Sequence, residues 1–226
     1  MLNIIFSSVI GPAIAVTVVL GIILILSTIY KESQYSRASN IAFSGSTYRF
    51  TRGVKEGRTD LFFDLDTSNN NPSSLKYIVD WYATAISNLI QKHGQIDRVA
   101  FIEKDSGPVG AITLLSGVLQ RINLPAIIVR VRKRLPQNSL KGISGDNVKN
   151  VILVTDVFTS GGGIKIAIKK LRKNNINTKA VVFYINRSKE EYFKQVEKEI
   201  GVPLVYFDTV IKKADFNNKK KHLNAA

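Results

Sequence analysis

The chain has 226 residues, of which 45% are hydrophobic and 22% charged, an ordinary globular composition that allows one good-sized domain. It contains no cysteine, and its two histidines, His93 and His222, lie far apart, so we expect no disulfide, no thiolate metal site and no metal site built on histidine. The formal net charge of +15 favours anionic partners such as nucleic acid, anionic lipid or a polyphosphate substrate, without choosing among them.

The first thirty residues carry no charged side chain. An uncharged run of more than ~20 residues is long enough to cross a bilayer as a helix. A cleaved signal peptide is the alternative, but the run has neither a basic start nor a small-residue cleavage site. We therefore expect a single transmembrane anchor, and the basic residues that follow it predict a cytoplasmic C-terminal domain by the positive-inside rule.

Composition divides the chain into four parts. We expect the anchor at 1–30, a polar linker at 31–46, one domain at 47–211 and a basic tail at 212–226. The tail is predicted to be solvated or to make weak contact with a negative membrane face.

Short apolar runs alternate with longer amphipathic stretches in the predicted domain. In chain order, we expect a strand at 61–65, a helix at 72–93, a strand at 98–102, a helix at 107–120, a strand at 126–131, a long loop at 132–149, a strand at 151–154, a helix at 164–174, a strand at 180–185, a helix at 189–200 and a strand at 204–207. This alternation predicts an α/β fold with a mostly parallel sheet flanked by helices.

Residues 151–163 read VILVTDVFTSGGG, a buried strand followed by a carboxylate, two hydroxyls and three glycines. Ligands of open α/β sheets bind at the carboxyl ends of the strands. Glycine N–H groups and the start of the next helix suit a phosphate, and the carboxylate suits sugar hydroxyls or a metal ion between them. The spacing fits neither a Walker loop nor a dinucleotide fingerprint. A plain Gly-rich strand-to-helix turn is the alternative.

This segment resembles the phosphoribosyl diphosphate (PRPP) signature of type I phosphoribosyltransferases. Thr155 stands in place of the first acidic residue of that signature, and Gly163 in place of its last hydroxyl residue. The resemblance implies that Asp156 holds the ribose hydroxyls and is a catalytic residue. It also implies that the 5′-phosphate is cradled by Thr159, Ser160, Gly161, Gly162 and Gly163.

Two further segments resemble the orotate branch of that family. Residues 55–63 (KEGRTDLFF) are similar to its Lys-Ser-Gly-Arg segment, which implies that Lys55 touches the substrate and that Phe62 and Phe63 line the base pocket. Residues 183–187 (FYINR) resemble its late strand ending in Asp-Arg, which makes Arg187 a candidate for the orotate carboxylate. The alternatives are juxtamembrane charge for Lys55, core packing for one phenylalanine, and a solvated strand end for Arg187.

The remaining resemblance concerns pyrophosphate. Residues 103–110 (EKDSGPVG) lie where the family has its pyrophosphate-binding loop, which makes Lys104 a candidate ligand. Val131-Arg132-Lys133 resembles the opening of its mobile catalytic loop, so Arg132 and Lys133 are candidate catalytic residues. A solvated basic loop is the alternative reading. The chain then continues RLPQNSLKG, without the histidine that the orotate enzymes carry there.

The resemblance therefore implies an orotate phosphoribosyltransferase-like enzyme. Such an enzyme transfers phosphoribosyl from PRPP to a nitrogen base for pyrimidine nucleotide synthesis and releases pyrophosphate. Its Mg²⁺ is bound through PRPP, and its partners are PRPP and a nucleobase or orotate. A homodimer is implied, and no nucleic acid partner is expected. The altered loop supports a second hypothesis, a non-catalytic PRPP-binding sensor or regulator anchored to the membrane.

Overall fold

The computed structural model describes residues 17–27, 48–50, 61–63, 72–103, 109–131, 140–142 and 147–209. The chain forms two compact units, Met1–Ser39 and Asn40–Ala226. In the first unit, residues 17–27 are helical.

The transmembrane helix predicted within residues 1–30 is wrong. Among the residues that the structure describes, no helix is long and apolar enough to cross a membrane. A bilayer requires about 20 consecutive apolar residues in one helix, and the described helix covers 17–27. The localisation that depended on this helix, a single-pass membrane protein with a cytoplasmic C-terminal domain, is therefore wrong as well.

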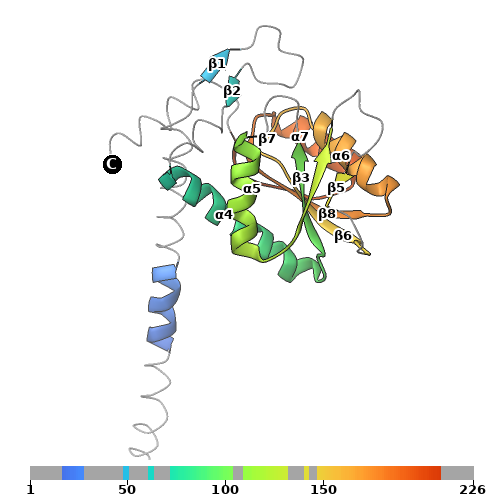
Figure 1. Ribbon diagram of the computed structural model, residues 1–226. Coiled ribbons are helices and arrows are strands. Elements are labelled where there is room, and N and C mark those ends of the chain that lie inside the picture. Colours follow the sequence, from blue (N-terminus) through green and yellow to red (C-terminus); the bar gives the residue numbers. More distant parts are fainter. Residues whose placement is uncertain are drawn as a thin grey trace, which may run out of the picture. The chain divides into compact units, whose positions relative to one another are not determined.

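The second unit contains a seven-stranded sheet in the order β5-β4-β3-β6-β8-β7, with β9 also paired to β8 (Figure 1). Neighbouring strands run parallel except β4 and β5, which are antiparallel. The strands are β3 (Arg98–Glu103), β4 (Ala126–Arg130), β5 (Leu140–Lys141), β6 (Asn150–Val154), β7 (Val157–Phe158), β8 (Asn177–Asn186) and β9 (Leu204–Thr209). A separate antiparallel pair joins β1 (Tyr48–Phe50) and β2 (Leu61–Phe63).

Helices cover both faces of the large sheet (Figure 1). They are α4 (Pro72–His93), α5 (Val109–Ile122), α6 (Gly162–Lys173) and α7 (Glu190–Ile200). Side chains of successive strand residues point to opposite faces. In β8, the Tyr184 ring accordingly lies 5.5 Å from the ring of Trp81 in α4, whereas the Phe183 ring lies 6.3 Å from that of Phe193 in α7. The predicted α/β sheet with flanking helices is confirmed for this unit.

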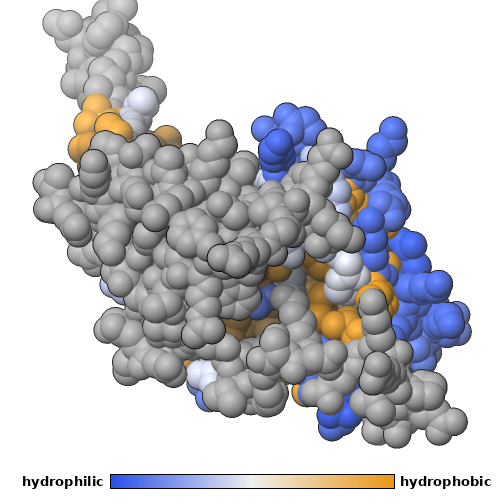
Figure 2. All heavy atoms as spheres, turned by 90° about the horizontal axis from the view of Figure 1, so that it is seen from above, coloured by the Kyte–Doolittle hydropathy of each residue, from blue (hydrophilic) through white to orange (hydrophobic). Residues whose placement is uncertain are grey.

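The central strands are buried because helices pack on both of their faces. Four of the five residues of β6 and the last seven of β8 are buried, most of them Val, Ile or aromatic. Such continuous apolar runs are typical of strands inside parallel sheets. By contrast, α6 presents basic side chains to solvent, and Figure 2 shows hydrophilic residues along the side of the molecule on which α6 lies.

Besides β1 in the smaller sheet, two short strands of the large sheet, β5 and β7, lie outside the predicted elements. β5 lies within the predicted loop at 132–149, where Leu140 pairs with Val129 and Lys141 with Ile128. β7 follows the predicted strand after two residues and pairs with the end of β8. Each contains two residues, so its existence depends on a distant partner strand rather than on a local pattern.

Candidate functional site

The candidate site lies at the carboxyl edge of the sheet. Because β3, β6 and β8 are parallel, the residues that follow them come out at the same edge. Thr155 and Asp156 follow β6, and Arg187 follows β8. The structure therefore brings together Asp156, Arg187 and the segment 159–163 at one edge of the sheet.

The Asp156 carboxylate is held by its own loop. Its Oδ1 accepts a hydrogen bond from the Val157 N–H at 2.7 Å and another from the Thr155 hydroxyl at 3.0 Å. Thr155 is only 5% exposed. A second carboxylate at this buried position would lie beside that of Asp156 and repel it. The threonine at this position donates a hydrogen bond to the Asp156 carboxylate instead.

The glycine segment forms the start of α6. Gly161 precedes the helix with φ of 66°, in the left-handed region. No side-chain hydrogen bond caps this N-terminus, and the first turn has no acidic residue. The first N–H groups of a helix lack intrahelical partners and carry partial positive charge. This end of α6 is thus suited to an anion, and a phosphate is the anion that such a loop commonly holds.

Space at the glycines supports the same interpretation. A Cβ at Gly161 would lie 2.8 Å from Val196 Cγ1 and 3.1 Å from Phe158 Cε2, so that position requires glycine on steric grounds too. At Gly163, a Cβ would have no heavy atom of the described residues within 4 Å. The loop is therefore packed tightly against α7 and β7 at Gly161 and is open toward the described residues at Gly163.

Arg187 is buried rather than solvated. It is 7% exposed, and its N–H donates to the Phe158 carbonyl at 2.9 Å. The preceding Asn186 closes the end of β8, because its Oδ1 accepts from both the N–H and the hydroxyl of Ser188, at 3.0 and 2.8 Å. The alternative of a solvated strand end is wrong for Arg187, which lies against the start of the glycine segment.

The other predicted site residues are not placed by the structure. Lys55, Lys104, Arg132 and Lys133 lie outside the described residues. Phe62 and Phe63 belong to β2, where they pair with Arg49 and Tyr48, but the structure describes only their backbone. The roles of these six residues stay predictions.

Sequence patterns missed two tyrosines beneath the site. The Tyr82 hydroxyl donates to the Thr155 carbonyl at 2.7 Å, and the Tyr192 hydroxyl donates to the Ser160 carbonyl at 3.1 Å. Burial, and then the negative charge of Asp156, raise the pKa of Tyr82 well above its ordinary value. Tyr82 lies in α4, and nothing in the neighbouring sequence indicates which carbonyl its hydroxyl would reach.

The comparisons with known proteins agree with this geometry. No family model matches the sequence. The orotate phosphoribosyltransferase of Methanosarcina mazei is 26% identical over 160 residues, covering 69% of this chain and 79% of that protein. The transcriptional regulator GfcR of Methanococcus vannielii is 29% identical over 136 residues, covering 58% of this chain and 62% of the regulator.

A solved structure shares the fold. The crystal structure of Mycobacterium tuberculosis orotate phosphoribosyltransferase in complex with PRPP matches with a TM-score of 0.55 at 14% identity, covering 81% of this chain and 92% of that one. The resemblance inferred from residues 151–163 is therefore confirmed: the chain has the fold of the type I phosphoribosyltransferases and, among them, is similar in sequence to the orotate enzymes.

Proposed function

We propose that this protein is a PRPP-dependent phosphoribosyltransferase that transfers phosphoribosyl to orotate or a related nitrogen base and releases pyrophosphate. The observation that carries the proposal is the joint position of Asp156, the open N-terminus of α6 and Arg187 at one sheet edge. The similarity to orotate phosphoribosyltransferases supports the choice of reaction.

In this proposal the 5′-phosphate and the ribose hydroxyls of PRPP each bind to a different group of the site. The 5′-phosphate lies at the N-terminus of α6, where the N–H groups of 161–163 donate to it. The ribose hydroxyls donate to the Asp156 carboxylate, which its two loop hydrogen bonds hold in a fixed orientation. Positive charge develops on the ribose as pyrophosphate leaves, and the preorganised carboxylate stabilises that charge without rearranging.

The cofactor in this proposal is Mg²⁺, bound through PRPP. A half-buried carboxylate at the sheet edge, such as that of Asp156, is the hard oxygen donor that this ion prefers. When bound, the ion neutralises charge on the diphosphate. Arg132, Lys133 and Lys104 are proposed to hold the leaving pyrophosphate, on the strength of the resemblance alone. The homodimer that the resemblance implies also stays a prediction.

Arg187 supports an acidic base as the acceptor. Its guanidinium is charged at every physiological pH, and its backbone is fixed beside the glycine segment. Charge-assisted pairing with a carboxylate is the strongest hydrogen bonding available to such a group. Orotate carries a carboxylate and the common nucleobases do not, so this residue favours orotate.

A PRPP-binding regulator without catalysis is the second candidate. The similarity to transcriptional regulator GfcR favours it, as do Thr155 in place of an acid and the loop after Lys133 that lacks histidine. The decisive assay incubates the full chain with PRPP, Mg²⁺ and either orotate or one nucleobase, and measures pyrophosphate. The enzyme releases pyrophosphate with orotate. The regulator binds PRPP in calorimetry but releases none with any base.

Replacing Asp156 with asparagine should weaken binding of Mg²⁺-PRPP by about 1–3 kcal/mol, because a charge-assisted hydrogen bond to the ribose is lost. Calorimetry of the full chain measures the affinity. Asp97→Asn is the matched control, since Asp97 lies at the amino edge of the sheet, where its Oδ2 accepts from the N–H groups of Lys149 and Asn150. Unchanged affinity in a folded Asp156→Asn variant would contradict the site assignment.

A further inference from the structure

Two tyrosine hydroxyls hold the two ends of the candidate site loop from opposite faces of the sheet. Tyr82 belongs to α4 and reaches the Thr155 carbonyl at 2.7 Å. Tyr192 belongs to α7 and reaches the Ser160 carbonyl at 3.1 Å. These contacts span 73 and 32 residues of sequence, so each one ties the loop to a distant helix.

Each of these carbonyls belongs to the peptide group that precedes a residue of the candidate site: Asp156 after Thr155, and Gly161 at the N-terminus of α6 after Ser160. A peptide unit is planar, so a hydrogen bond that fixes the Thr155 carbonyl also fixes the backbone N–H of Asp156. Fixing the Ser160 carbonyl likewise fixes the N–H of Gly161, the residue that turns the chain into α6 with φ of 66°. The first bond therefore orients the carboxylate, and the second orients the N-terminus of α6.

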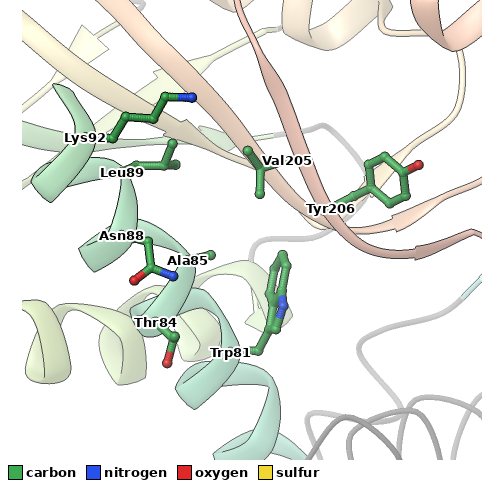
Figure 3. A pocket seen from close by; sticks show the side chains of 8 residues that line it. All are labelled: Trp81, Thr84, Ala85, Asn88, Leu89, Lys92, Val205 and Tyr206. Carbon is green, nitrogen blue, oxygen red and sulfur yellow. The ribbon is translucent and has the colours of Figure 1, made fainter. Parts of the chain in front are cut away.

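The Tyr82 hydroxyl is firmly placed. Its side chain is 0% exposed, with its ring 4.9 Å from that of Trp81 and 6.2 Å from that of Tyr184. Its raised pKa keeps the hydroxyl protonated, so it stays a donor. Trp81 is the single tryptophan of the chain and lines a hollow of about 370 Å³ between α4 and β9 (Figure 3). Its fluorescence is thus a local probe of the Tyr82 environment.

The two ends of the loop are mechanically separated. Between them, β7 pairs with β8 through Val157 with Ile185 and Phe158 with Asn186. The Phe158 ring is buried and stacked 5.3 Å from the Phe183 ring. Because β7 is held in the sheet between Thr155 and Ser160, we expect a structural change at one of these residues not to be transmitted to the other.

We propose that Tyr82 and Tyr192 are positioning residues that divide the recognition of a phosphoribosyl ligand. Tyr82 positions Asp156, which binds the sugar hydroxyls, and Tyr192 positions the start of α6, which binds the phosphate. This assignment rests on the proposed function, because it takes a phosphorylated sugar as the ligand. It adds two residues that contact neither the sugar nor the phosphate.

The test compares two probes, inorganic phosphate and ribose 5-phosphate, by calorimetry on the full chain. Tyr82→Phe removes one hydroxyl. It should lower the affinity for ribose 5-phosphate by about tenfold, the effect of one lost hydrogen bond, while the affinity for inorganic phosphate stays within about twofold of that of the unchanged chain. Tyr192→Phe should weaken both probes by the same factor, because both carry the phosphate. Tyr206→Phe is the matched control, since Tyr206 is 38% exposed on β9, and should change neither affinity.

A loss of fold would not imitate the Tyr82→Phe pattern, because it lowers both affinities together. For Tyr192→Phe, an unchanged urea unfolding transition followed by Trp81 fluorescence separates a local effect at the Ser160 carbonyl from a loss of fold. Thr155→Val gives a second test of the sugar end, since it removes the hydroxyl that donates to Asp156, and should reproduce the Tyr82→Phe selectivity. Equal weakening of both probes in Tyr82→Phe, or no weakening, overturns the division of roles. Failure of the unchanged chain to bind either probe overturns the proposed function instead. Trp81 fluorescence checks that α4 keeps its packing in each variant.

Discussion

Gly161→Ala is expected to destabilise the domain by about 3 kcal/mol, since a left-handed backbone costs an L-residue about 1–2 kcal/mol and overpacking adds a similar amount. The added Cβ would lie 2.8 Å from Cγ1 of Val196, which is buried and stiff at χ1. Relief of this contact must move the start of α6 away from α7, so phosphate affinity should fall at least about tenfold. Urea unfolding followed by Trp81 fluorescence measures the stability, and calorimetry measures the affinity.

Gly163→Ala is the matched control for stability. Gly163 lies in the first turn of α6 without a positive φ, and its Cβ would have no described heavy atom within 4 Å. Alanine favours a helix by up to about 1 kcal/mol over glycine, so this variant should be as stable as the unchanged chain or more so. Equal stability of the two variants would mean that Gly161 is not constrained as described.

The central strands of the sheet were predictable because they are continuous apolar runs of strand length. Residues 151–154 and 180–185 were predicted as strands, and they lie within β6 and β8. The amphipathic spacing at 72–93 likewise predicted α4 with its observed bounds. Burial on both faces produces this signal, and so the most buried elements were the easiest to predict.

Residues 1–30 show where composition misleads. An absence of charge satisfies the chemical requirement of a membrane span, but it does not determine where a helix begins and ends. Among the described residues of this run, 17–27 are helical, and no described helix is long and apolar enough to cross a membrane. Hydropathy without helix bounds was therefore insufficient.

Sequence patterns pointed only to those parts of the candidate site whose residues are close together along the chain. Asp156 and the glycines lie in one segment, and their order along the chain indicates a carboxylate for sugar hydroxyls followed by backbone N–H groups for a phosphate. Tyr82 and Tyr192 could not be assigned, because each reaches the loop from a helix on a different face of the sheet. Such contacts depend on the packing of whole helices, and no local pattern records them.

Lys133→Ala should lower orotate-dependent pyrophosphate release by at least ~100-fold, on the scale of losing one preorganised donor. The expectation follows from the resemblance of residues 131–133 to the opening of the catalytic loop. If Lys133 stabilises the pyrophosphate charge that develops as the bond breaks, it acts mainly in the transition state. Its loss should then reduce kcat far more than PRPP affinity. Pyrophosphate release and calorimetry on the same full-chain preparation separate the two quantities.

Lys194→Ala serves as the control, because Lys194 is an exposed lysine on α7 whose ammonium pairs with Glu190 one helical turn away. It should turn over like the unchanged chain. Normal turnover in Lys133→Ala would mean that the loop is not the catalytic element and that the orotate-type alignment of 131–142 is wrong. If the unchanged chain binds PRPP yet releases no pyrophosphate with any base, the loop has lost its chemistry. The similarity to GfcR then decides in favour of a regulator.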